Sequence, residues 1–253
     1  MADPCAQRRY GARFAADAAD VTAAQRLRHL CFMQGGGGVP RPDRLDADRF
    51  DAVCRHVLVE DRRSGRLVCC LRLLPLPDGD RIGQSYAAQF YDLSGLQGFR
   101  GRMVEMGRFC IHPEVRDPDV LRMAWGAITR FVDDNAVELL FGCSSFAGTD
   151  PARYLDAFGM LQARHLAPAR WLPQVKAPDV VRFAAHAGLH LSDPLLAARR
   201  MPPLLRSYLA MGGWVGDHAV VDRDLNTLHV FTGLEIRAIP AARARSLRAV
   251  AGE

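Results

Sequence analysis

Apolar residues recur along this chain with two different periods, which predict a mixture of strands and helices. Helical spacing over residues 20–34 and 118–134 predicts two helices, the second with Pro and Asp in its first turn. Short apolar runs between turn residues predict strands at 8–15, 56–61, 67–76, 103–112, 137–146, 214–222 and 227–236. A Ser-Gly turn joins the second and third of these strands as a β-hairpin.

Three segments depart from this regular pattern. Residues 35–44, GGGGVPRPDR, contain glycines and prolines that must end the first helix. Residues 147–206 are irregular and rich in Ala, Pro, Arg and His, with helical pieces such as DPARYLDAFGML, so we expect an inserted helical lobe that covers a site. The basic stretch 239–250 is interpreted as a frayed C-terminus, with a helix that touches lipid as the alternative.

Composition indicates a soluble globular protein. The 253 residues are 49% hydrophobic and 24% charged, so we expect a single domain over residues 1–253. The sequence has no apolar run of the length needed to span a membrane, and its N-terminus lacks the apolar core of a secretory signal. Its 7 cysteines are scattered without a Cys-x-x-Cys pair, which predicts reduced thiols in a cytoplasmic protein.

The net charge of +5 comes almost entirely from arginine. A basic surface attracts nucleic acid, anionic lipid or an acidic protein, although a merely solvated surface has the same composition. The chain has neither a nucleic-acid motif nor a basic stripe interleaved with aromatic residues, so we expect no nucleic-acid partner.

Charged residues stand where a buried strand would need apolar ones. Glu105 and Arg108 lie in VEMGRFCIHPEVRD, three positions apart, so a regular strand would point them to opposite faces. Gly107 between them permits a β-bulge that would bring both to one face. Buried charges are costly unless they are paired. We therefore expect either part of an active site or a structural network of ion pairs that pins the glycine-rich loop.

Other candidate chemistry is weakly supported. His186 and His190 have i,i+4 spacing but lack a third ligand, so no metal site is predicted. Ser144 and Ser145 in GCSSFAG do not form a nucleophile elbow, and no Gly-x-Gly-x-x-Gly fingerprint indicates a redox cofactor.

The segments AQRLRHLCF, DRFDAVCRHVLV, LRLLP and EMGRFCIHPEVR resemble those of GNAT-fold acyltransferases that take acyl groups from acyl carrier protein. One branch of that family, the acyl-homoserine-lactone synthases, has a series of residues matched here by Arg28, Phe32, Asp48, Asp51, Arg72, Phe90, Glu105 and Arg108. The other branch, the L-ornithine Nα-acyltransferases, is similar over residues 8–236, including LLFGCSSFAGTDP and PPLLRSYLAMGGWVGDHAVVD. The resemblance implies an α/β, GNAT-like acyltransferase fold, with a mixed, mostly antiparallel sheet flanked by helices.

Two departures from these branches affect the choice of substrate. Lactone synthases usually carry a Trp shortly after the residue matched by Phe32, and this chain has none there, which disfavours S-adenosylmethionine. Residues 226–230 read NTLHV where the ornithine branch often has Asn-Thr-Thr-Asp-Val, so the acceptor amine stays open.

The resemblance implies direct transfer of a 3-hydroxyacyl group from acyl carrier protein to the α-amine of ornithine. It implies that Glu105 and Arg108 are catalytic, that Arg28, Phe32, Asp48, Asp51, Arg72 and Phe90 bind substrate, and that Phe109, Ile111, Arg116 and Ser144 bind the acyl donor. No cofactor is expected beyond the phosphopantetheine thioester of the donor. Because the product would be a lyso-lipid, peripheral membrane contact is expected as well. The alternatives are a lactone synthase and a binding module without catalysis.

Overall fold

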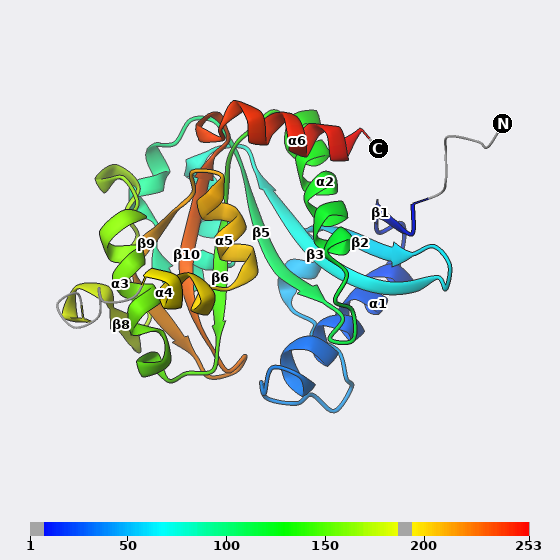
Figure 1. Cartoon of the computed structure of the whole chain (residues 1–253), viewed down its shortest axis with the longest axis horizontal. Coiled ribbons are helices and arrows are strands. Elements are labelled where there is room, and N and C mark those ends of the chain that lie inside the picture. The colour runs from blue at the N-terminus through cyan, green and yellow to red at the C-terminus, as the bar shows by residue number, and fades with distance from the viewer. Residues whose placement is uncertain (1–7, 187–193, 253) are drawn as a thin grey trace.

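The computed structural model describes residues 8–186 and 194–252, and one twisted sheet organises them (Figure 1). Across the sheet, the strands are β1 (Tyr10–Phe14), β2 (Arg55–Asp61), β3 (Arg66–Leu76), β5 (Arg102–Ile111), β6 (Val137–Ala147), β10 (Thr227–Glu235), β9 (Trp214–Asp222) and β8 (Val180–Arg182). Neighbouring strands in this sheet are antiparallel except β5 and β6, which are parallel. A separate pair is formed by β4 (Tyr91–Asp92) and β7 (Gln174–Val175).

Helices cover both faces of the sheet. The front face, turned toward the viewer in Figure 1, carries α2 (Pro118–Asp134), α3 (Leu155–Arg164), α4 (Pro194–Arg200), α5 (Pro203–Ala210) and α6 (Ala241–Ala251). The back face carries α1 (Ala18–His29), which continues as a π-helical turn, η1 (Leu30–Gln34). Short 3-10 turns also line the chain, at Arg49–Ala52, Gly79–Gln84, Ala87–Gln89, Ser94–Gly98, Pro151–Tyr154, Ala169–Trp171, Phe183–His186 and Ile236–Ala238.

Period-two alternation in the strands explains why both faces are covered. Val57 and Val59 of β2 pack in the same apolar cluster as Val120 of α2, on the front face. Leu58, between them, packs with Leu27 of α1 on the back face. Successive side chains of a strand point to opposite faces, so a strand apolar on both sides must lie between two layers of helices.

The two parallel strands separate halfway along their length. Their pairing runs from Arg102 and Val137 to Met106 and Gly142 and does not continue beyond. Gly142 has φ +156°, and a Cβ there would lie 2.2 Å from the carbonyl oxygen of Met106. Only glycine allows this approach, so Gly142 is the last residue at which β6 stays close to β5.

β5 also contains the predicted bulge. Arg72 pairs with Gly107 and Cys70 pairs with Cys110, so Arg108 and Phe109 together lie opposite the single residue between them on β3. Within the bulge, Arg108 has a left-handed backbone conformation, at φ +54°. The bulge changes the direction of the Arg108 side chain, as expected for a strand that must aim a charged group.

The predicted strands and helices are confirmed, with two corrections outside the centre of the sheet. The C-terminal stretch is not frayed: α6 packs on α2, where Arg248 binds Asp133 at 2.8 Å and Val250 lies against Gly126. Residues 147–206 contribute strands as well as helices, because β8 forms one edge of the main sheet. Within the described ranges, no helix is long and apolar enough to cross a membrane.

Replacing Gly142 with Ala is expected to lower the free energy of unfolding by about 2 kcal/mol or more, because the added methyl group would collide with backbone and the φ angle is strained. Urea denaturation of the purified protein measures the change. Gly83→Ala is the matched control, since an added Cβ there meets nothing within 4 Å. Equal stability of both variants would contradict the role given to Gly142.

Candidate active site

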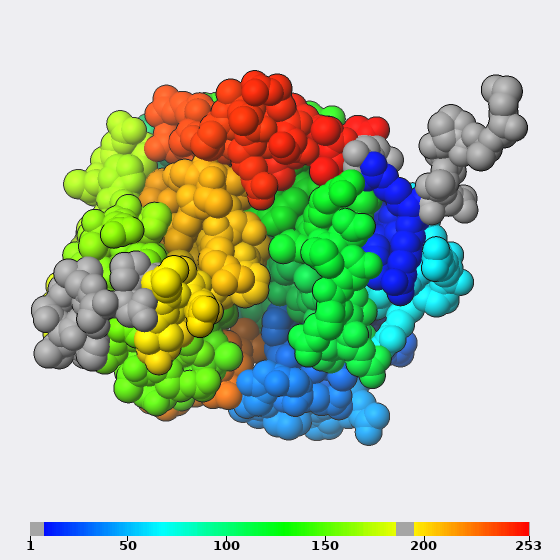
Figure 2. All heavy atoms as spheres, in the orientation of Figure 1, coloured from blue at the N-terminus to red at the C-terminus, as the bar shows by residue number. Residues whose placement is uncertain are grey.

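A cavity of about 300 Å³ occupies the gap where β5 and β6 part. Its walls come from β5, β6, the start of α5 and the hairpin of β9 and β10. From the front face, the surface is hollowed between α2 and α5, above this gap (Figure 2). Pro202 and Leu204 line the front of the cavity, and Tyr86 and Glu105 line its back. The cavity therefore lies within the sheet and is lined by residues of both of its faces.

Glu105 is the more deeply buried of the two acids that line this cavity, with only 4% of its surface exposed against 8% for Asp222. Its two carboxylate oxygens accept hydrogen bonds of 2.7 Å from the backbone N–H groups of Tyr86 and Ala87. Burial raises the pKa of Glu105 to about 7, against the opposing effect of these bonds and of two nearby arginines. A carboxylate with a pKa near neutrality is suited to accept a proton under physiological conditions.

Three arginines and three aspartates form one buried network beside Glu105. Its ion pairs are Arg28–Asp46 at 3.0 Å, Arg28–Asp51 at 2.8 Å, Arg72–Asp48 at 2.6 Å, Arg72–Asp51 at 2.7 Å, Arg108–Asp46 at 2.9 Å and Arg108–Asp48 at 3.4 Å. The formal charges cancel, which is the condition under which buried charges are tolerated. The predicted network of ion pairs is therefore present, and two of its arginines, Arg72 and Arg108, also line the cavity. A role of these residues in an active site stays a prediction.

The network lowers the pKa of two of its acids, Asp48 and Asp51. Burial raises the pKa of Asp51, but hydrogen bonds from Arg28 and the charge of Arg28 outweigh it and hold the pKa well below the usual range. The pKa of Asp48 is likewise lowered, because Arg72 outweighs the effect of burial. These aspartates stay ionised, while Glu105 is the acid of this region that titrates near neutrality.

The sequence-predicted residues fall into two groups. Those that line the cavity are Phe32, Arg72, Glu105, Arg108, Phe109 and Ser144. The others lie outside its lining: Arg28, Asp48 and Asp51 in the network, Phe90 against the ring of His229, Ile111 further along β5, and Arg116 exposed just before α2. Direct contact of this second group with substrate stays a prediction.

Sequence reasoning missed several residues of the site. Asp46 completes the network. Its only signal in the sequence was the run LDADRFD, in which it is a third acid beside Asp48 and Asp51. The guanidinium carbon of Arg108 lies 4.9 Å from the centroid of the Tyr86 ring. Nothing local in the sequence indicated that Tyr86 belongs to the site. Asp222, Thr227 and His229 also line the cavity. Their only signal in the sequence was that they are polar residues within otherwise apolar strands.

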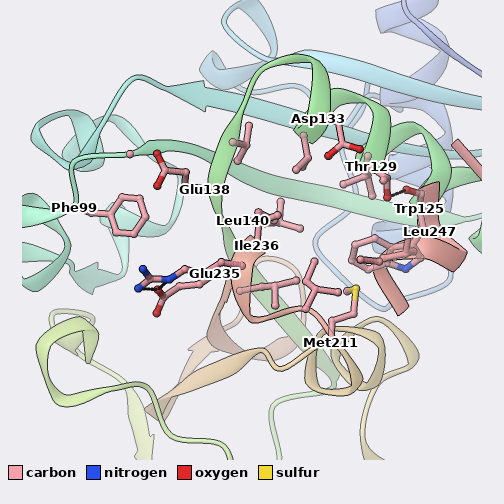
Figure 3. A pocket seen from close by; sticks show the side chains of 18 of the residues that line it. Phe99, Trp125, Thr129, Asp133, Glu138, Leu140, Met211, Glu235, Ile236 and Leu247 are labelled. Atoms are coloured by element: carbon pink, nitrogen blue, oxygen red, sulfur yellow. Dashed lines mark hydrogen bonds and ion pairs between the residues drawn. The ribbon is translucent and has the colours of Figure 1, made fainter. Parts of the chain in front are cut away.

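A second, larger cavity of about 720 Å³ lies on the front face beneath α6 (Figure 3). Trp125, Leu140, Met211 and Leu247 give it mainly apolar walls. Two of the three acidic side chains in its lining, Asp133 and Glu235, are paired with arginine. Its chemistry suits a hydrocarbon group rather than the reacting groups of a substrate.

The structure does not describe the alternative metal site at His186 and His190, because His190 lies outside the described residues. Within the described ranges, no three His, Cys, Asp or Glu side chains are arranged to hold a metal ion. Six of the cysteines are described, and they are free thiols.

Asp46→Asn is expected to lower the free energy of unfolding by about 3–5 kcal/mol, because it leaves Arg28 and Arg108 without a buried counter-charge. Chemical denaturation measures the loss. Asp43→Asn, in the same segment but exposed, is the control and should change stability by less than about 0.5 kcal/mol. A small effect at both positions would show that the network does not stabilise the fold.

Comparison with known proteins agrees with this architecture. The family described as acetyltransferase (GNAT) domain matches residues 27–126. The crystal structure of a CoA-dependent acyl-homoserine lactone synthase, BjaI, with SAM and isopentyl-CoA, superposes with a TM-score of 0.51 over 96% of this chain and 89% of that one. The two chains are 15% identical, so this likeness shows the fold alone. The fold is the predicted GNAT-like acyltransferase fold.

Sequence relatives narrow the family further. The chain is 30% identical to the L-ornithine N(alpha)-acyltransferase of Brucella abortus, over 90% of this chain and 84% of that protein. It is 35% identical to the L-ornithine N(alpha)-acyltransferase of Rhodobacter capsulatus, over 91% of each chain. With this identity over nearly the whole chain, and with an acid of raised pKa in the gap of a GNAT sheet, the chain belongs to the L-ornithine N(alpha)-acyltransferase family.

Proposed function

We propose that this protein is an N-acyltransferase that moves a 3-hydroxyacyl group from acyl carrier protein to the α-amine of L-ornithine. The observation that carries the proposal is Glu105, a buried carboxylate with a pKa near 7 in the gap between β5 and β6. The names of the relatives support ornithine as the acceptor.

The reaction needs an amine without its extra proton. The α-ammonium of the acceptor gives a proton to Glu105, directly or through one water, and the freed amine attacks the thioester carbonyl carbon. A C–N bond forms and the C–S bond breaks. The attacking nitrogen loses a second proton, which the departing pantetheine thiolate accepts, so the products are an amide and a thiol.

The acceptor approaches from the back face in this proposal. Arg72 and Arg108 line the cavity there, and a guanidinium binds a carboxylate in a two-pronged geometry. Asp48 and Asp51 hold the guanidinium of Arg72, and Arg28 in turn holds Asp51. We assign these three residues to orienting the arginines, and Phe32 to the apolar wall of the cavity.

The acyl donor approaches from the front face in this proposal. Beyond Met106, the edge of β5 that faces β6 has no strand partner, so backbone N–H groups between Phe109 and Ile111 are candidates to bind the thioester oxygen. Arg116, just before α2, and the N-terminus of α2 would hold the single phosphodiester of the pantetheine arm. Ser144 lines the same cavity. The apolar cavity beneath α6 suits the hydrocarbon end of the acyl group.

The net charge of the chain and the lipid character of the product indicate which partners the enzyme has. Acyl carrier protein is acidic, and the chain carries a net charge of +5, so attraction between them would speed docking. The thioester itself supplies the activated acyl group, so no further cofactor is needed. We place the enzyme in the cytoplasm, in peripheral contact with the inner membrane that receives the product.

Thiol release from 3-hydroxyacyl-carrier protein tests this function. With a panel of ornithine, lysine, glycine and S-adenosylmethionine, we expect release with ornithine and an N-acyl-ornithine by mass spectrometry. Release with S-adenosylmethionine alone would make the protein a lactone synthase. Carrier-protein binding without release with any amine would make it a binding module.

Glu105→Gln should lower kcat/KM by about 100- to 10,000-fold, because the variant has no carboxylate to accept the proton. In the wild type, kcat/KM should fall as the pH drops through about 7, where Glu105 becomes protonated, and this limb of the profile should vanish in the variant. Initial rates between pH 5.5 and 9 measure both effects.

The matched control is Glu114→Gln, which removes an exposed carboxylate shortly after the same strand. Its activity should stay close to that of the wild type. A thermal unfolding curve for each variant separates loss of the base from loss of the fold. Near-normal turnover by a folded Glu105→Gln protein would reduce Glu105 to a structural role.

A further inference from the structure

The hairpin of β9 and β10 contributes three polar side chains to the reaction cavity for which the mechanism above has no use. Asp222 of β9 pairs directly with Thr227 of β10, so their side chains lie on the same face of the sheet. His229 lies two residues after Thr227 and therefore faces the same way. All three line the cavity that contains Glu105 and Arg108.

Two of these side chains have a buried polar atom without a partner in the part of the chain that the structure describes, and the third has a carboxylate without an ion pair. The Nε2 atom of His229 and the Oγ1 atom of Thr227 are buried without a hydrogen bond. Asp222, only 8% exposed, accepts one bond of 2.9 Å from the backbone N–H of Leu225, and none of the ion pairs found in the described ranges includes it. Buried polar groups are normally satisfied, so the two unpaired atoms of His229 and Thr227 beside a buried carboxylate indicate a missing ligand.

The hydrogen bonds of His229 determine which ring nitrogen carries the proton. Tyr91 donates its single hydroxyl proton to the carbonyl oxygen of His229 at 2.8 Å, because a carbonyl oxygen can only accept. The Nδ1 atom, 3.1 Å from the same hydroxyl, must then be the donor of that contact. Burial lowers the pKa of His229 to about 3, so the ring is neutral and its Nε2 atom presents a bare lone pair.

The three groups together offer hydrogen-bond acceptors and one negative charge. A neutral apolar group would leave the Nε2 atom of His229 and the Oγ1 atom of Thr227 unpaired. The Asp222 carboxylate disfavours an anion, although the charge of Arg108 also acts on Asp222 and His229. An alkylammonium carries a positive charge and three N–H donors, which matches these three acceptor groups in number. Burial also raises the pKa of Asp222, which a bound cation would reverse.

We propose that Asp222, Thr227 and His229 form a subsite that binds the side-chain ammonium of the amino-acid acceptor. The proposal rests on the acyl transfer proposed above and makes these residues the determinants of acceptor specificity. Glu105 would meet the α-amine, and the hairpin subsite would hold the amine at the other end of the same molecule. A carbon skeleton without a second amine would leave the subsite unfilled.

The test compares two acceptors of equal carbon skeleton: ornithine, and 2-aminopentanoate, which lacks the δ-amine. Asp222→Asn removes the charge and keeps the oxygen that accepts from Leu225. For this variant, kcat/KM with ornithine should fall about 10- to 100-fold, mainly through a higher KM, as expected for a lost hydrogen bond to a charged group. With 2-aminopentanoate, kcat/KM should stay within about threefold of the wild-type value.

Two further variants complete the design. Asp224→Asn removes an exposed charge two residues away and should leave both acceptors unaffected. Thr227→Val removes one acceptor of the subsite without a charge change and should lower kcat/KM for ornithine alone. If the Asp222→Asn variant does not fold, the same comparison of the two acceptors with the Thr227→Val variant tests the subsite.

The outcomes distinguish the two proposals. An equal loss with both acceptors, or no loss with either, would overturn the subsite while leaving acyl transfer to ornithine intact. A wild-type protein that transfers acyl groups to neither acceptor would overturn the proposed function. Calorimetric titration with ornithine would then still show whether Asp222→Asn weakens binding, and equal affinity of wild type and variant would reject the subsite.

Discussion

The separation of β5 from β6 is the constraint on which the rest of this structure depends. Up to Met106 and Gly142 the two strands are paired, and beyond this point their facing edges are open. The close approach at Gly142 tolerates no side chain, which fixes where the pairing ends. The open edges create a cavity inside the sheet rather than on its surface. The cavity therefore has residues of both faces of the sheet in its lining.

Charge in such a place has to be compensated, and the arginine–aspartate network does this. Arg108 reaches it through the bulge of β5, and Asp46 is supplied by the loop that follows the glycine-rich segment. The glycine-rich segment is also bound to the turn between β9 and β10, because the backbone N–H of Val39 donates to the carbonyl oxygen of Asp224 at 2.8 Å. One set of contacts thus holds the two sides of the cavity together while leaving Glu105 outside the ion pairs, where burial sets its pKa.

The two faces of the sheet differ in chemistry. The back of the cavity has Glu105, Arg108 and the unpaired groups of the β9–β10 hairpin, which suit a small charged amino acid. The front of the cavity has the start of α5, and a separate cavity with mainly apolar walls lies beneath α6. The two faces of the sheet therefore offer different chemical surroundings to a ligand.

The sequence by itself determined the strands and the two long helices, and it singled out Glu105 and Arg108 as charges within an apolar strand. Apolar periodicity and the cost of burying charge are local signals that a single chain carries. Only the tertiary structure decided which groups are paired: Asp46 became a network member and Asp222 stayed without a cation, although both are aspartates beside apolar residues. It also decided that α6 packs on α2 and that Arg108 is the left-handed residue of the bulge. Pairing depends on distances between segments far apart in the chain, and no local pattern contains those distances.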